Sequence, residues 1–219
     1  MILLPTKGRP HLLKRFLDCC VETGVTEKIL LIFDGEEDRA IYEEEYKMSF
    51  PVDYLIAPKG TTLNNCFNLA YAQYPDEPYY GLVSDDCTPE TPRWDVKLRD
   101  ACQPDKISWP AEGIHNEKLP GFAFLGGDLV RKMGFIYPPT IKHWFTDNFL
   151  NALQLKCGNG DYLPHVMLRH RHMVNGLAEK DETYLSQPDH ETDAKAYAAF
   201  MKDEFTALAE KIQPQAEAA

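Results

Sequence analysis

Short apolar runs alternate with amphipathic segments along the first part of the chain. Each run ends at a proline, a glycine or an aspartate, as buried strands of a parallel sheet commonly do. The segments between the runs repeat apolar residues at helical spacing. The predicted strands are residues 1–5, 27–35, 52–58 and 79–86, and the predicted helices are residues 11–24, 38–48 and 66–74. Strands alternating with helices predict an α/β fold with a mostly parallel central sheet flanked by helices.

After Asp95 the alternation loosens and the pattern becomes α+β in character. It predicts a strand within 106–113, a strand, glycine turn and short helix within 121–135, a helix over 143–158 and a last strand over 162–172. Residues 189–219 form one helical pattern with a polar tail. We therefore predict a single domain over residues 1–188, with halves at 1–95 and 96–188, followed by a C-terminal helix and tail over 189–219.

The charge and cysteine content narrow the class of protein. A net charge of −11 and a pI near 5.1 argue against general affinity for a nucleic-acid backbone, which requires clustered Lys and Arg. The six cysteines form no CxxC pair and no regular framework, which is typical of reduced thiols in a cytosolic protein. The segment "MILLPTKGRP" resembles neither a signal peptide nor a spanning helix, so we expect a soluble, cytoplasmic protein.

Polar residues follow each of the four predicted strands of the first half. They are "PTKGRP" after the first strand, Asp34 after the second, "GTTLNN" after the third and "SDD" after the fourth. In a parallel sheet such strand ends converge on one ligand-binding crevice. The loops contain glycines but neither a GxGxxG nor a GxxxxGK[ST] motif, so the crevice is predicted to be neither a dinucleotide site nor a P-loop.

The aspartate pair in "YYGLVSDDCTPETPRWD" allows two interpretations. Asp85 or Asp86 caps the turn that leads to Pro89 and Pro92, which is a common use of aspartate after a strand. Alternatively, the carboxylates hold a hard divalent cation such as Mg²⁺ or Mn²⁺. The polar ends of the other strands favour the second interpretation.

Six motifs follow one another within residues 1–185: "ILLPTKGRP", "LLIFDG", "LVSDDCTPETPRWD", "GFAFLGGDLVRKMG", "WFTDNFL" and "HVMLRHRH". In this order they resemble the motifs of nucleotide-sugar-dependent glycosyltransferases of the GT-A type (glycosyltransferase family 2-like), especially compact bacteriophage-encoded forms. The resemblance implies a GT-A domain with a nucleotide-binding half at 1–95 and an acceptor half at 96–188. It also implies nucleotide-sugar contacts from Pro5, Thr6, Arg9, Asp34, Asn64, Asn65, Asp85, Gly126 and Gly127.

The family's metal motif is aspartate, any residue, aspartate, and here it is Ser84-Asp85-Asp86. The resemblance therefore implies that Asp86 binds Mn²⁺ or Mg²⁺, which would neutralise the leaving diphosphate. Asp85 would contact the ribose or lie beside the ion. The family's histidine ligand corresponds to His170 or His172, which share one face of the predicted strand. Arg169 and Arg171 would point to the opposite face, for packing or acceptor binding.

An inverting transferase needs a carboxylate that takes the proton of the acceptor hydroxyl. By the resemblance this base is Asp147, with Asp128 as the next candidate; the alternative for Asp147 is a helix N-cap. The implied activity is transfer of a hexosyl or pentosyl group from a nucleotide-diphosphate sugar, with a UDP-sugar favoured, to a hydroxyl group. A hydroxymethylated base of phage DNA is one acceptor, in the host cytoplasm. The alternatives are a nucleotidyltransferase and a non-catalytic nucleotide- or sugar-binding module of the same fold.

Overall fold

The four apolar runs of the first half are neighbouring strands in the computed structural model, which describes residues 1–45, 51–179 and 181–213. These strands are β1 (Ile2–Thr6), β2 (Ile29–Asp34), β3 (Asp53–Ala57) and β4 (Tyr79–Leu82). They lie in the order β3-β2-β1-β4, and all of their pairings are parallel. Parallel pairing brings the carboxyl ends of these strands to one edge of the sheet, as the sequence predicted.

The second half adds four strands of mixed direction to the same sheet, which becomes β3-β2-β1-β4-β7-β6-β8-β5. They are β5 (Cys87–Pro89), β6 (Ile107–Ala111), β7 (Phe124–Gly126) and β8 (Gly160–His170). β7 is antiparallel to both β4 and β6, and β5 is antiparallel to β8, whereas β6 and β8 are parallel. The predicted α/β fold with an α+β second half is confirmed.

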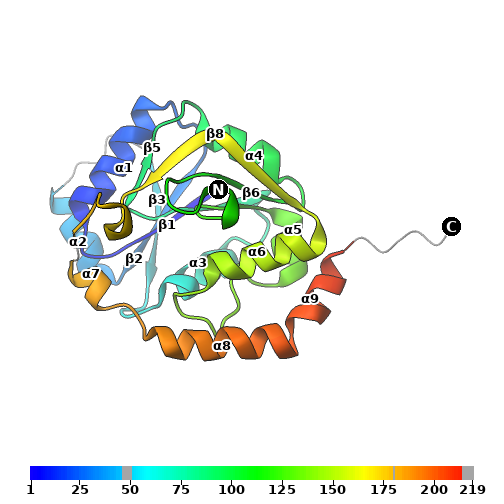
Figure 1. Cartoon of the computed structure of the whole chain (residues 1–219). Helices are drawn as coiled ribbons and strands as arrows, with labels where there is room; N and C mark the ends of the chain where they lie inside the picture. Colours follow the sequence, from blue (N-terminus) through cyan, green and yellow to red (C-terminus); the bar gives the residue numbers. More distant parts are fainter. Residues whose placement is uncertain (46–50, 180, 214–219) are drawn as a thin grey trace.

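Helices cover both faces of the sheet because side chains along a strand alternate between its faces. In β1, Ile2 and Leu4 pack on one side and Leu3 packs on the other. The first side holds α1 (Pro10–Glu22), α2 (Glu36–Glu45) and α4 (Trp94–Cys102). The second holds α3 (Leu63–Gln73), α5 (Gly127–Met133), α6 (Thr146–Cys157), α8 (His190–Asp203) and α9 (Phe205–Ile212). Short elements η1 (Asn116–Lys118), η2 (Met173–Asn175) and α7 (Glu182–Leu185) complete the chain (Figure 1).

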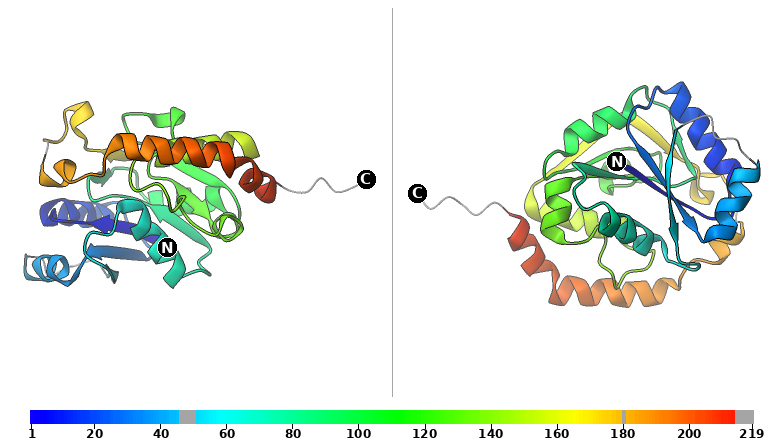
Figure 2. Two further views of the ribbon diagram at one scale, coloured as in Figure 1. Left: turned by 90° about the horizontal axis from the view of Figure 1, so that it is seen from below. Right: turned by 180° about the vertical axis from the view of Figure 1, so that it is seen from behind.

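The C-terminal helical pattern is broken at Glu204 into α8 and α9, which follow the outer edge of the domain (Figure 2). Asp189 caps α8 by accepting a hydrogen bond from the Thr192 backbone N–H at 2.8 Å. The side chains of Phe200, Phe205 and Ile212 are buried in the core and hold this pair of helices against the domain. Residues 46–48 of the second predicted helix and residues 214–219 of the predicted tail lie outside the described residues.

None of the helices in the described parts of the chain combines the length and the apolar character that crossing a membrane requires.

Candidate active site

The loops after β1, β2 and β3 contact one another at the predicted edge of the sheet. The Lys7 ammonium lies 2.7 Å from one carboxylate oxygen of Asp34. The Gly60 backbone N–H donates to the other oxygen at 2.6 Å. An open depression of about 480 Å³ lies beside them, lined by residues 35–37 and 56–59. Asp34 therefore joins three strand ends around a space that a small ligand can enter.

Asp85 is buried against the loop that follows β1. Its carboxylate accepts hydrogen bonds from the Thr6 hydroxyl at 2.8 Å and from the Arg9 guanidinium at 3.4 Å. Tyr42 of α2 supports both donors, because its hydroxyl lies 2.6 Å from Thr6 Oγ1 and accepts from the Arg9 backbone N–H at 3.1 Å. Burial and the neighbouring charge of Asp86 raise the pKa of Asp85 to about 7.

Arg9 also connects this loop to the segment after β8. Its Nε and Nη2 atoms each donate to the Asp181 carboxylate at 2.8 Å. Two parallel bonds of this kind fix the plane of the guanidinium. Arg9 is therefore held between Asp85 and Asp181, with its charge at the strand-end edge.

Asp86 and Glu112 flank the imidazole of His170. The His170 Nε2 atom lies 3.4 Å from an Asp86 carboxylate oxygen, and Nδ1 lies 3.8 Å from Glu112 Oε2. Burial lowers the pKa of His170, but the two carboxylates outweigh it and raise that pKa to about 9. For Asp86, burial acts to raise the pKa. The interactions with His170 and Ser84 outweigh burial, so the pKa of Asp86 lies below its usual value. The Asp86 carboxylate and the His170 imidazole therefore form a close pair at the site.

Glu112 was not predicted from the sequence. It follows β6, is fully buried, and accepts hydrogen bonds through Oε1 from the backbone N–H groups of Ile114, His115 and Asn116. Oε2, the oxygen nearer to His170, has no hydrogen-bond partner among the described residues. The signal that could have found it is the one that found Asp86, an acidic residue at the end of an apolar strand, here in "ISWPAEG".

His172 lies beside His170 but outside the strand. β8 ends at His170, and His172 caps η2 by accepting a hydrogen bond from the Val174 N–H through Nδ1 at 3.2 Å. The two imidazole rings are 5.1 Å apart between centroids. The structure therefore brings both predicted histidines to the site, with only His170 at ion-pair distance from Asp86.

Asp147 lies in the first turn of α6 and does not cap it. The N-cap position is Phe145, which has φ 64° and makes no side-chain cap bond. Burial, together with the charge of Glu112, raises the pKa of Asp147 to about 6, against the opposing charges of His170 and His115. Asp147 therefore lies within electrostatic reach of the Asp86–His170–Glu112 group.

The loop that precedes α6 is held by a carboxylate from α8. Asp193 is fully buried and accepts hydrogen bonds from the backbone N–H groups of Lys142, His143 and Trp144 at 3.0, 2.8 and 2.8 Å. This contact fixes the chain immediately before Asp147. The C-terminal helices thereby help to position the candidate base.

Comparisons with known proteins identify the fold. No family model matches the sequence, and no curated protein matches it significantly. Among solved structures, GalNAc-T7 with UDP, GalNAc and Mn²⁺ superposes with a TM-score of 0.64 at 12% identity, over 94% of this chain and 48% of that one. Residues 1–349 of Staphylococcus aureus TarS give 0.58 at 10% identity, over 94% and 72%. A nucleotidyl transferase from Methanothermobacter gives 0.52 at 13% identity, over 94% and 97%.

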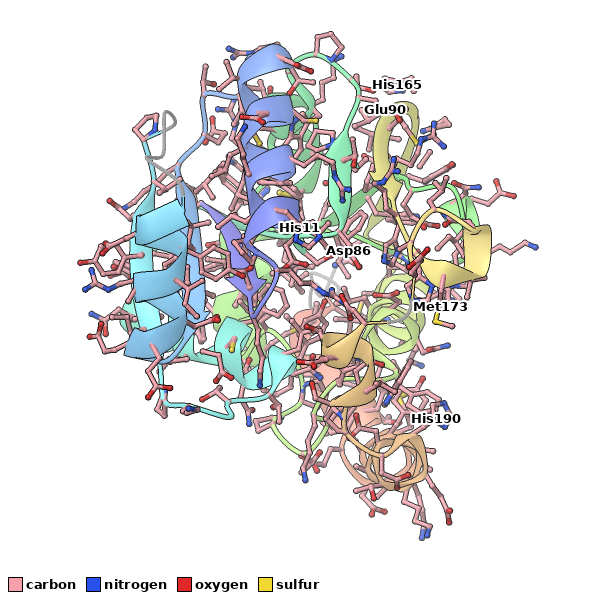
Figure 3. All side chains as sticks on the ribbon, turned by 90° about the vertical axis from the view of Figure 1, so that its left-hand side faces the viewer. His11, Asp86, Glu90, His165, Met173 and His190 are labelled. Atoms are coloured by element: carbon pink, nitrogen blue, oxygen red, sulfur yellow. The ribbon has the colours of Figure 1, made fainter. Side chains whose placement is uncertain are left out.

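The chain has a GT-A-type fold. In this fold, the described strand-end edge carries Thr6, Arg9, Asp34, Asp85 and Asp86 together. Figure 3 views the molecule from the side of α1 and α2, and Asp86 lies near the first turn of α1, where His11 is labelled. Pro5 is buried in β1, directly before Thr6.

The glycine motif lies at the opposite edge of the GT-A sheet, which corrects its predicted role. β7 runs antiparallel to β4 and pairs Gly126 with Tyr79, the first residue of β4. A Cβ atom on Gly126 would meet Pro104 O at 2.2 Å, and one on Gly127 would meet Glu77 O at 2.2 Å, so both glycines serve close backbone packing. Asp128 is exposed there and pairs with Arg131 at 2.5 Å. These three residues do not reach the site.

The other end of the same motif does reach the site. Phe122, which precedes β7, has φ 50° and lies 5.0 Å from the His170 ring between centroids. A bulky residue in the left-handed region is uncommon and is held there by its surroundings. Because β7 runs antiparallel to β4, Phe122 lies at the site, and Gly126 and Gly127, which were predicted to contact the nucleotide sugar, lie at the opposite edge.

Asn64 also differs from its prediction. Its side chain has no exposed surface, and its amide donates to the Ile141 carbonyl at 2.8 Å. Asn64 thus links α3 to the loop before α6 and offers no surface to a ligand. Asn65 is half-buried on the same helix turn.

The described residues fit a divalent ion that substrate helps to bind. Residues 1–45, 51–179 and 181–213 contain no group of three or more His, Cys, Asp or Glu side chains placed to hold a metal by themselves. Asp86 and His170 supply one carboxylate and one imidazole close together. Mg²⁺ and Mn²⁺ sites with few protein ligands are usually completed by substrate phosphates and water.

Proposed function

We propose that this chain is a metal-dependent, inverting glycosyltransferase that transfers a sugar from a nucleotide-diphosphate sugar to a hydroxyl group. One observation carries the proposal: Asp86 and His170 lie at ion-pair distance at the strand-end edge of a GT-A-type fold, and the charges of His170 and Glu112 act on the buried, pKa-shifted Asp147. Glycosyl transfer requires groups that neutralise the leaving diphosphate and a carboxylate that accepts a proton. Asp86 and His170 suit the first role, and Asp147 suits the second.

The nucleoside half of the donor is assigned to the loops after β1 and β2. Asp34 offers a carboxylate next to the open depression at residues 35–37 and 56–59, and Thr6, Arg9 and Asp85 offer a hydroxyl, a guanidinium and a second carboxylate at the same strand ends. These groups suit the hydroxyl and amide edges of a ribose and a base. UDP is the favoured nucleotide, since UDP is present in the solved structures of GalNAc-T7 and of TarS.

Asp86 and His170 would hold Mn²⁺ or Mg²⁺, with His172 as the alternative imidazole. When bound, such an ion supplies positive charge to the departing diphosphate. Mn²⁺ is present in the GalNAc-T7 structure. On the protein side, Glu112 keeps His170 in place through Nδ1, so that Nε2 faces Asp86.

Asp147 takes the proton from the acceptor hydroxyl as that oxygen attacks the anomeric carbon. A pKa of about 6 leaves this carboxylate ionised at neutral pH and still basic enough to accept a proton. Direct attack by the acceptor, without a covalent sugar–enzyme bond, inverts the anomeric configuration.

The test is a panel of nucleotide sugars incubated with the protein and Mn²⁺, followed by measurement of released nucleoside diphosphate. Glycans, proteins and hydroxymethylated DNA are the acceptors, and mass spectrometry identifies the modified one. We expect release with one donor, loss of release in EDTA, and loss in Asp86→Asn with an unchanged melting temperature. Release that is equal in EDTA would remove the metal from the proposal. A full panel without release, from a protein that still binds UDP, would indicate a binding module instead.

A nucleotidyltransferase is the second candidate, favoured by the superposition on 97% of the Methanothermobacter chain. Such an enzyme forms a nucleotide sugar from a nucleoside triphosphate and a sugar phosphate, releasing pyrophosphate. Pyrophosphate release from UTP and a panel of sugar 1-phosphates distinguishes the two reactions. The loop "PTKGRP" contains one glycine, Gly8, and is a poor triphosphate cradle, which favours glycosyl transfer.

A further inference from the structure

Two arginines near the acidic pair have enclosed nitrogen atoms without a partner. Nε and Nη2 of Arg15, and Nε of Arg171, are buried and have no hydrogen-bond partner among the described residues. Arg15 and Arg171 are each half-buried as whole residues. An enclosed N–H group without an acceptor costs free energy and usually indicates an ion or water that belongs there.

Arg15 and Arg171 come from neighbouring parts of the structure, because α1 packs on β5 and β5 pairs with β8. Arg15 is on α1, which packs on β5, and the Arg171 backbone N–H donates to the Asp86 carbonyl at 3.0 Å, directly after β8. Burial and the charge of Arg171 lower the pKa of Arg15. Like charges that approach each other in a partly buried place are unfavourable unless an anion lies between them.

The neighbouring aspartates do not fill this role. Asp85 is bonded by Thr6 and Arg9, and Asp86 by Ser84 and His170. Neither carboxylate is at hydrogen-bond distance from the side chains of Arg15 or Arg171 in the described structure. The Arg169 guanidinium, by contrast, donates two hydrogen bonds to the Glu90 carboxylate, at 2.5 and 2.8 Å.

We propose that Arg15 and Arg171 form an anion site that binds a phosphate group of the acceptor. This inference rests on the proposed glycosyl transfer. Arg15 is on α1, which packs on β5, and Arg171 follows β8, which pairs with β5, whereas the nucleoside groups Thr6 and Asp34 end β1 and β2. Two forked cations match the oxygens of a phosphate better than any neutral hydroxyl. The acceptor class is therefore a phosphate-bearing molecule whose hydroxyl is presented to Asp147.

The probe is inorganic sulfate, a phosphate analogue that does not precipitate divalent ions. It is titrated at constant ionic strength into the full ¹⁵N-labelled chain, and the arginine Nε–H signals are followed by NMR. Arg15→Lys and Arg171→Lys assign their own signals by removing them. We expect the Arg15 and Arg171 signals to shift and saturate while the Arg169 signal stays unchanged. Arg171→Gln should weaken sulfate binding at Arg15 by about tenfold or more, and Arg169→Gln should not.

The titration is then repeated with saturating UDP and Mg²⁺. Unchanged sulfate affinity is expected for an acceptor site. Competition by UDP would overturn the acceptor assignment, because the arginines would then belong to the donor diphosphate. Signals that do not move with sulfate, or that move equally in Arg171→Gln, would overturn the site itself. No sugar donor or turnover enters this measurement, so its failure is separate from failure of the proposed transfer reaction.

Discussion

Asp147 combines a raised pKa with a position in the first turn of α6. Its pKa of about 6 lies above the usual carboxyl value, so the folded protein holds a proton there more tightly than the unfolded chain does. Stability contributed by that proton is lost as the pH rises through about 6, so at neutral pH the ionised carboxylate destabilises the folded protein relative to the unfolded chain. A carboxylate kept ionised at this cost is typical of a group retained for chemistry.

Replacement of Asp147 by Asn should therefore separate activity from stability. The change keeps the shape and removes the charge, so the melting temperature at pH 7.5 is expected to stay equal or rise. Turnover is expected to fall by about 10²–10⁴-fold, with UDP affinity unchanged. A thermal melt, titration calorimetry with UDP and product assays on one preparation check the three statements. Turnover within a few-fold of the parent would show that Asp147 is not the base.

The pH profile gives an independent test of the same residue. With the donor saturating, turnover of the parent should rise tenfold per pH unit below about 6 and level off above it, as Asp147 loses its proton. The residual activity of Asp147→Asn should lack this step. A step that persists in the variant would assign the titration to another group.

The variant Glu112→Gln tests whether Glu112 holds His170 in place. In Glu112→Gln, Oε1 can still accept the three backbone N–H groups, but the group facing Nδ1 changes from an acceptor to an N–H donor. The pKa of His170 should fall below about 9, since one of two carboxylates has lost its charge. Mn²⁺ affinity should fall by about 10–100-fold. Imidazole ¹⁵N shifts in metal-free protein and Mn²⁺ titration measure the two effects, with the exposed Glu117→Gln as control. Unchanged values in both would reduce Glu112 to a loop anchor.

At the scale of elements, α8 supports the site through one buried carboxylate. Asp193→Ala would leave the N–H groups of Lys142, His143 and Trp144 without their acceptor. We expect a loss of about 3 kcal/mol or more in the free energy of unfolding. Displacement of the adjacent Asp147 should lower turnover by roughly tenfold to a hundredfold.

The matched control for that change is Asp189→Ala on the same helix. Asp189 is exposed and caps α8, so its loss should cost about 1 kcal/mol and leave turnover unchanged. Chemical denaturation and steady-state assays compare the two variants. Equal turnover in both would show that α8 stabilises the domain without positioning the base.

The elements also show where sequence reasoning succeeds. The parallel half was predictable because each β-α unit contains its own apolar run, stop signal and amphipathic helix, and parallel pairing then places Thr6, Asp34 and Asp86 at one edge. The glycine motif was misplaced because its direction depends on the antiparallel pairing of β7 with β4, which no local pattern encodes. Glu112 was missed because the strand and helix pattern is looser after Asp95 and none of the recognised motifs includes "ISWPAEG".

At the scale of the molecule, late segments of the chain contact earlier ones at the site. The Arg9–Asp181 pair links the loop after β1 to the segment after β8, and Asp193 links α8 to the loop before α6. Both links bring late parts of the sequence against early ones, so neither could be read from local periodicity. The candidate base and the candidate metal ligands are therefore positioned by the complete domain and not by one half of it.

Thiol reactivity reports the integrity of that complete domain. All six cysteines are free, as the sequence indicated. Cys20, Cys66, Cys87 and Cys102 are buried in the two cores on opposite faces of the sheet, and burial raises the pKa of each, to about 12 for Cys66 and Cys102. Cys19 and Cys157 are half-buried. Because only the thiolate reacts, the four core thiols should be inert in the folded protein.

We therefore expect a thiol reagent to modify at most Cys19 and Cys157 in the native protein, and all six cysteines in guanidinium chloride. The double variant Cys19→Ser, Cys157→Ser should show no native reaction, and its core thiols should react at a rate that follows global unfolding. Each core face carries at least one of these thiols, so the experiment examines both helical layers at once. Rapid reaction of any core thiol in the double variant would show that one layer opens independently of the other, contrary to a single cooperative domain.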